Sequence, residues 1–138
     1  MKIKTSALTG RALDWAVAMI NESMPTLINE NGKYVVGIPN LFSTDFNGNL
    51  MPAYYQYSPS TNWALCGQLM DKYCKSFGMV QGITDKTWRA FAYGIPCRGQ
   101  DTMRLASGDT LKIAFCRALV TAQLGDEVEI PDELVEAK

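Results

Sequence analysis

The stretch Tyr57-Ser58-Pro59-Ser60-Thr61-Asn62-Trp63 constrains the fold more than any other part of the chain. Pro59 fixes its own φ near the helical value and pushes Ser58 into an extended conformation. Ser60 or Thr61 can then supply a side-chain oxygen to the first free amides of a helix. We therefore predict that a helix begins after this stretch, and that the other elements pack around that helix.

The residues after this start repeat at helical spacing. Apolar side chains recur three or four positions apart, at Trp63, Cys66, Met70, Tyr73, Cys74 and Phe77. This spacing places them on one face of a helix, and Gly78 is a natural stop. The pattern predicts a helix from Trp63 to Phe77 with an apolar face turned towards the core.

Two further segments have the pattern of helices with a wide apolar surface. The first begins near Ser6 or Thr9 and is stopped by Pro25. The second follows Gly108-Asp109-Thr110, with Asp109 as the expected cap, and ends at Gly125. Both segments are apolar on more than one side, so we expect each to be covered by other elements.

Shorter segments have the alternation or the aromatic content of strands. The predicted strands are residues 2–5, 33–36, 53–57 and 87–93, with a turn at Asn31-Gly32 and an irregular polar segment at 99–107. This order of elements predicts an α+β fold, with an antiparallel or mixed sheet and helices packed on both faces. Such an arrangement is an α/β/α sandwich.

The length of 138 residues suits a single domain, 1–138. Residues 24–52 are rich in Asn, Gly and Pro and are expected to form an inserted loop or hairpin. Long loops in compact domains are often functional, although a tolerated insertion explains this one equally well. Residues 126–138 form an acidic carboxyl-terminal tail, in which Pro131 opens a last turn of helix.

The composition is that of an ordinary globular protein, because 47% of residues are hydrophobic and 20% charged, and we expect the protein to stay in the cytoplasm. No apolar run approaches the roughly 18 residues of a membrane span, and the amino terminus has no apolar core of a secretory signal. A net charge of -1 argues against a protein that binds duplex nucleic acid. Arg89, Arg98 and Arg104 are close enough in sequence to form a small anion-binding surface, but solvated surface arginines are the simpler interpretation.

The chain contains no histidine. That absence excludes Ser-His-Asp and Cys-His catalysis and removes the commonest nitrogen ligand of zinc. The acidic residues include no isolated pair in an apolar setting, so paired-carboxylate catalysis has no candidate. The cysteines at 66, 74, 97 and 116 suit reduced core thiols, and Cys97, between Pro96 and Arg98, is the only one in a loop-like setting with a cation that could lower its pKa. We expect no enzyme, no cofactor and no metal site.

Three parts of the chain resemble a known family. They are residues 8–18 (LTGRALDWAVA), residues 57–64 (YSPSTNWA), and residues 116–120 with 124–128 (CRALV, LGDEV). Together they resemble the NinX-like proteins of phages and prophages and the related phage ABA sandwich domains. In this resemblance residues 24–51 are an addition, and Asn62 stands where the family pattern often has an acidic residue. The resemblance implies an α/β/α sandwich and a phage accessory protein, and it implies no biochemical activity.

One functional hypothesis is that the protein binds a small anionic, nucleotide-like ligand without chemistry, as in sequestering a host defence signal. A helix amino terminus attracts anions, aromatic rings stack, and arginines add counter-charge. The ligand-binding residues would be Ser58, Ser60, Thr61, Asn62, Trp63, Arg89 and Arg98. A structural alternative is a plain capped turn followed by Trp63 in the core. In that case Trp63→Ala should lower the free energy of unfolding by about 3 kcal/mol.

A second hypothesis is that the protein binds or inhibits a host protein. The acidic tail and the segment 38–51 would then form the contact surface. A homodimer is also compatible with the wide apolar helices. Both hypotheses are binding functions, which fits the lack of any reactive cluster in the sequence.

Overall fold

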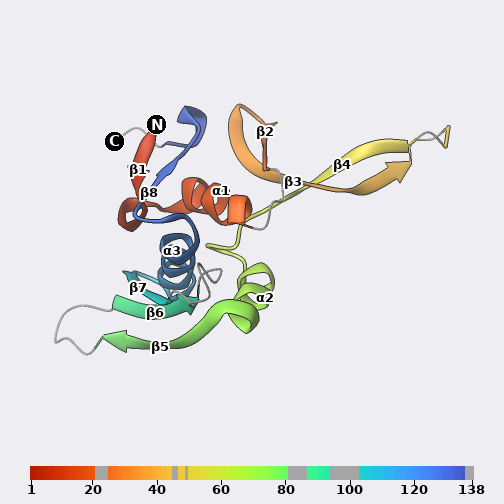
Figure 1. Ribbon diagram of the computed structural model, residues 1–138. Helices are drawn as coiled ribbons and strands as arrows, with labels where there is room; N and C mark the ends of the chain where they lie inside the picture. Colours follow the sequence, from red (N-terminus) through yellow and green to blue (C-terminus); the bar gives the residue numbers. More distant parts are fainter. Residues whose placement is uncertain (21–24, 45–46, 49, 81–86, 94–102, 136–138) are drawn as a thin grey trace.

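The computed structural model describes residues 1–20, 25–44, 47–48, 50–80, 87–93 and 103–135. Within these residues lie three α-helices: α1 (Gly10–Ile20), α2 (Trp63–Tyr73) and α3 (Leu111–Leu124). Two short 3-10 helices, η1 (Thr5–Ala7) and η2 (Asp132–Leu134), lie near the ends of the chain. Figure 1 shows α3 between α1 and the sheet beneath it.

The described strands form three small antiparallel sheets. One pairs β1 (Lys2–Lys4) with β8 (Glu127–Glu129). The second has the order β2 (Thr26–Glu30), β3 (Lys33–Thr44), β4 (Leu50–Gln56). The third has the order β5 (Cys74–Val80), β6 (Thr87–Tyr93), β7 (Met103–Gly108). The fold is therefore α+β with antiparallel strands, as expected.

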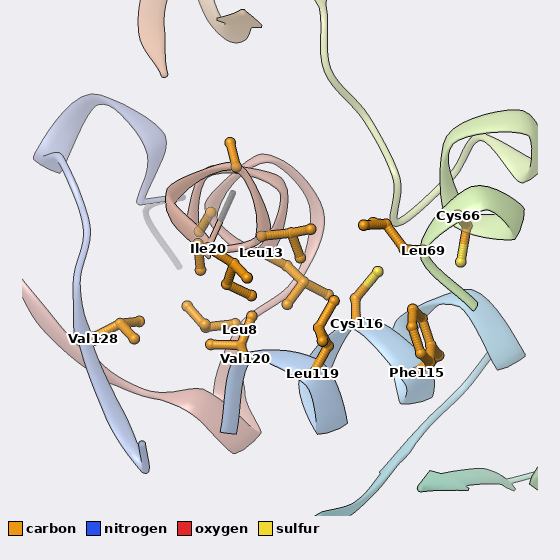
Figure 2. Packing of buried hydrophobic residues seen from close by; sticks show 14 of the residues in the cluster. Leu8, Leu13, Ile20, Cys66, Leu69, Phe115, Cys116, Leu119, Val120 and Val128 are labelled. Carbon is orange, nitrogen blue, oxygen red and sulfur yellow. The ribbon is translucent and has the colours of Figure 1, made fainter. Parts of the chain in front are cut away.

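The hydrophobic core is centred on α3 rather than on the helix that begins at Trp63. Six consecutive or nearly consecutive residues of α3 are buried: Ala114, Phe115, Cys116, Ala118, Leu119 and Val120. In α2 only Cys66 and Leu69 are buried. Figure 2 shows side chains of α1, α2 and β8 converging on α3. Because α3 is apolar on several sides, it can contact α1, α2 and the sheet β5-β6-β7 at once.

The sheet β5-β6-β7 has α3 against one face. Ala90 and Ala92 of β6 are fully buried on that face, and such small side chains let a helix approach closely. On the opposite face Leu105 pairs with Phe91, and Leu105 remains 45% exposed. The expected second layer of helix is thus not found on this sheet among the described residues. The structure thus confirms the α+β class, whereas the finer arrangement of an α/β/α sandwich stays a prediction.

The helix after Trp63 is shorter than its sequence pattern indicates. It ends at Tyr73, and the next residues form strand β5, in which Phe77 pairs with Ala90 across the sheet. The backbone bonds to β6 outweigh a helical periodicity that continues to Phe77, because propensity is weak compared with tertiary pairing. The segment 99–107 also differs from expectation, since its residues from Met103 onwards belong to strand β7.

Of the loop and the hairpin expected at 24–52, the structure contains the hairpin. Asn31 and Gly32 both have positive φ, of 53° and 86°, as a two-residue hairpin turn requires. The side-chain oxygen of Asn29 accepts the Gly32 amide at 3.0 Å. Strand β3 then continues to Thr44 and pairs with β4, and this ribbon extends away from the helices (Figure 1).

The acidic carboxyl-terminal segment is ordered against the basic amino terminus as far as the structure describes it. Lys2 lies opposite Glu129 and Lys4 opposite Glu127 in the β1-β8 pair, and opposite charges across strands are favourable. The terminal amine also donates to the Ile130 carbonyl at 2.7 Å. No helix in the described part of the chain is long and apolar enough to cross a membrane.

Gly108, the last residue of β7, is pressed against α3. A Cβ at this position would lie 2.7 Å from Cγ2 of Ile113 and 2.9 Å from the backbone nitrogen of Ala114. Gly108→Ala should therefore lower the free energy of unfolding by about 1–3 kcal/mol, measured by urea denaturation. Gly78→Ala in β5 is the matched control, because a Cβ there meets no atom within 4 Å. Equal stability of the two variants would show that α3 does not pack this closely on β7.

Candidate functional site

The segment 57–63 is held against α1 by a buried carboxylate. The Ser60 amide donates to Oδ1 of Asp14 at 2.8 Å, and both residues are buried, at 2% and 4% exposure. The Tyr57 amide donates to the Val36 carbonyl at 2.8 Å, which ties the same segment to β3. The two segments that resemble the NinX-like proteins most specifically, 8–18 and 57–64, therefore meet through this hydrogen bond.

Burial changes the titration of Asp14. Loss of hydration raises the pKa of Asp14 from 3.8 to about 6, although hydrogen bonds from the backbone and side chain of Ser60 act in the opposite direction. The hydrogen bonds from Ser60 therefore replace only part of the hydration that the carboxylate loses on burial. The carboxylate has a structural role here, because it accepts a hydrogen bond from the Ser60 amide, which lies outside every helix and strand.

The cap of α2 is Asn62, not Ser60 or Thr61. Its Oδ1 accepts the amides of Ala64 at 2.8 Å and Leu65 at 3.3 Å. A capping side chain must stand immediately before the first helical residue, and Ser60 and Thr61 stand too early. In α3, likewise, the cap is Thr110 rather than Asp109. Since Asn62 already occupies two of the first amides of α2, the helix start alone does not offer an empty anion site.

Two hydroxyls that we expected to bind a ligand are turned towards the chain itself. The Ser60 hydroxyl lies 3.5 Å from the Gly10 carbonyl oxygen, and the Thr61 hydroxyl lies 3.4 Å from the Ser58 carbonyl oxygen. Ser58 is half-buried, whereas Thr61 is exposed. Ser58 and Ser60 therefore hold the segment in shape, and Thr61 remains accessible beside Asn62.

Trp63 is a surface residue, so the alternative that places it in the core is wrong. Its side chain is 54% exposed, and the ammonium of Lys112 lies 4.4 Å from the centroid of its ring. This is a cation–π contact between the first residue of α2 and the first turn of α3. No local signal in the sequence marked Lys112, because only the fold brings it to Trp63.

The two arginines of the expected site do not join this surface. Arg89 lies on β6 between Trp88 and Ala90, which face the core, so its side chain points to the face of the sheet away from α3. There it lines a hollow of about 360 Å³ with Phe77, Leu105 and other residues of the same sheet. Arg98 lies outside the described residues, as does Cys97.

The described cysteines are free thiols, as the sequence indicated. Cys66 of α2 and Cys116 of α3 are fully buried, and a hydrogen bond between the two thiols lowers the pKa of Cys66 and raises that of Cys116. Burial raises the Cys116 pKa further, which disfavours the reactive thiolate. Among the described residues no group of three or more Cys, Asp or Glu side chains could hold a metal ion.

Asp14 gives the folded protein a characteristic pH dependence. Its pKa is about 6 in the folded protein against 3.8 normally, so the folded state binds more protons between these values. The carboxyl's contribution to stability is full below pH 3.8 and is lost as the pH rises through about 6, by up to about 3 kcal/mol. Asp14→Asn retains an oxygen that accepts the Ser60 amide. As the pH rises from 3.8 through about 6, the free energy of unfolding of the wild type should therefore fall by up to about 3 kcal/mol relative to that of Asp14→Asn.

Urea denaturation of both proteins across that pH window measures this difference. Groups that titrate in both proteins cancel, because only the side chain at position 14 changes. Parallel profiles for the two proteins would mean that the Asp14 carboxyl is not buried as the structure shows.

A family model matches most of the chain. Its description is bacteriophage P22, NinX, and the match covers residues 4–123, including α1, the segment 57–63, α2 and most of α3. The matched range also runs through the segment 24–51, which we expected to be an addition. No curated protein sequence matches at significant similarity. Since the match takes in nearly every described element, this chain belongs to the bacteriophage P22 NinX family, a phage protein family of unknown function.

Proposed function

We propose that this NinX-family protein acts by binding rather than by catalysis, and that it binds a small anionic, nucleotide-like ligand. The observation that carries the proposal is the exposed indole of Trp63 with the Lys112 ammonium 4.4 Å from its ring centroid. An accessible indole can stack on a nucleobase, which is worth about 1–3 kcal/mol per base. The neighbouring ammonium can pair with a phosphate.

The position of Lys112 supports this interpretation. Lys112 is the second residue of α3, where the positive end of the helix dipole disfavours a cation. Trp63 is the first residue of α2, so the two contacting side chains belong to two helix starts. A lysine in this place costs α3 some stability, but it concentrates positive potential beside a stacking surface. That combination suits an anion with an aromatic part.

The proposed binding surface is narrower than the set that the sequence indicated. It comprises Thr61, Asn62 and Trp63, which are exposed, together with Lys112. Ser58 and Ser60 hold this surface in place, because the Ser58 carbonyl accepts the Thr61 and Asn62 amides and the Ser60 amide donates to Asp14. Binding alone would be sufficient for a phage accessory protein that sequesters a host defence signal.

A second candidate function is binding to a host protein. The observation that favours it is apolar surface on the face of the sheet β5-β6-β7 away from α3, where Met103 and Leu105, the cross-strand partners of Tyr93 and Phe91, are half-exposed at 44% and 45%. Extended apolar surface of this kind is typical of interaction sites. The β3-β4 ribbon, which projects from the helices in Figure 1, would be a further contact region.

The first proposal is tested by titrating nucleotides and cyclic nucleotides while tryptophan fluorescence is recorded. Trp15 and Trp88 are partly buried against the core, so a stacking ligand should quench mainly Trp63. Trp63→Ala should abolish binding yet lower stability by less than about 1 kcal/mol, because the ring is half in water. Trp63→Phe should retain part of the affinity, and Lys112→Gln should lower it on the order of ten-fold.

Arg89→Gln is the matched control, because it removes a positive charge from the other side of the sheet and should leave affinity unchanged. An absence of saturable quenching with every nucleotide would contradict the first proposal. Capture of a host protein that is lost in Leu105→Ser would then favour the second.

A further inference from the structure

A cleft that Trp63 does not line has the composition of a second binding site. It has a volume of about 530 Å³ and is lined by residues of β1, η1, β7 and α3 and by Asp126 and Glu127 at the start of β8. Figure 1 shows where these elements lie. The polar residues that line it include Lys4, Ser6, Ser107, Arg117, Asp126 and Glu127. Cavities of this size hold small ligands. The residues proposed above for nucleotide binding do not line it.

Arg117 of α3 is fixed at the wall of this cleft by two backbone carbonyls. Its Nε donates to the Leu8 carbonyl at 2.8 Å, and its Nη1 donates to the Ser107 carbonyl at 2.9 Å. These bonds hold the plane of the guanidinium between the end of η1 and strand β7. Its Nη2 has no hydrogen-bond partner among the residues that the structure describes. An arginine held in this way is preorganised to offer its remaining N–H groups to a ligand.

The charge of Arg117 lacks a close counter-ion. Partial burial lowers the pKa of its guanidinium, which means that the cation has lost some of its hydration. Within the described part of the chain, no carboxylate lies within 4 Å of it, and Asp109 acts only at longer range. A partly desolvated cation is normally compensated by an anion. The space next to it is a cleft in which Asp126 and Glu127 also lie, but neither is paired with Arg117.

We propose that this cleft binds a small oxyanion, the carboxylate or phosphate group of a polar ligand, with Arg117 as the main donor. The planar guanidinium matches two oxygens of such a group. Lys4 adds a second positive charge, and Ser6 and Ser107 provide polar surface around it. Asp126 and Glu127 also line the cleft and oppose the binding of an anion, so the affinity depends on both signs of charge.

The test uses the full chain labelled with ¹⁵N, titrated with inorganic phosphate and, separately, with acetate at constant ionic strength. Amide chemical shifts are followed, because phosphate also stabilises proteins non-specifically and would raise the melting temperature in any case. Saturable shifts at Ser6 and Ser107, without change at the Trp63 indole, are expected. The two titrations show whether phosphate or carboxylate is preferred.

Variants that change the charge of the cleft test whether the affinity for an anion rises and falls as expected. Lys4→Gln should weaken binding on the order of ten-fold, whereas Glu127→Gln, opposite Lys4 in the β1-β8 pair, should strengthen it. Lys72→Gln removes a positive charge from α2, which does not line the cleft, and should leave the cleft's affinity unchanged. Arg117→Lys should lose most of the affinity. Because Arg117 also donates to two carbonyls, the melting temperature of the Arg117→Lys variant is measured alongside. If that variant unfolds, the affinities of the Lys4 and Glu127 variants test the proposal.

The proposal is overturned if neither anion produces saturable shifts, or if Lys4→Gln and Glu127→Gln bind as the wild type does. It stands apart from nucleotide binding at Trp63. Trp63→Ala should leave the cleft's affinity for phosphate or acetate intact, so either site can fail without the other.

Discussion

The hydrogen bond from the Ser60 amide to the buried carboxylate of Asp14 positions the segment that leads into α2. It joins α1 to the segment that leads into α2, and it does so in the interior, where an unpaired amide would be costly. The carboxyl is itself poorly hydrated, so the bond offsets two desolvation costs at once. With the segment fixed, Asn62 caps α2 and Trp63 is brought to Lys112 at the start of α3.

Local signals predicted the local parts of this arrangement. Pro59 and the spacing after it placed the start of α2, and Asn31-Gly32 placed a hairpin turn that has the required positive φ values. The elements that form only through pairing with distant parts of the chain could not be predicted from local signals. The strand after Tyr73 forms because β6 pairs with it, and the acidic tail is ordered because β1 lies opposite it. Each of these pairings joins residues that share no pattern in the sequence.

The same distinction separates the residues of the candidate sites. Asn62 and Trp63 could be singled out because they stand beside a helix start. Lys112 and Arg117 could not, since they lie on an apolar helix and become distinctive only through what they contact. The grouping of Arg89 with the helix start failed for a simple geometric reason. Successive residues of a strand point to opposite faces, and the neighbours of Arg89 face the core.

The most direct test of the central interaction is hydrogen exchange of the Ser60 amide in the native protein. Ser60 lies outside every helix and strand, so without the bond to Asp14 its amide would exchange as a loop amide does. We expect instead that it exchanges as slowly as amides in the middle of α3, which open only when the whole domain unfolds. Exchange of the Ser60 amide at the rate of an unprotected amide would contradict the central role of its hydrogen bond to Asp14.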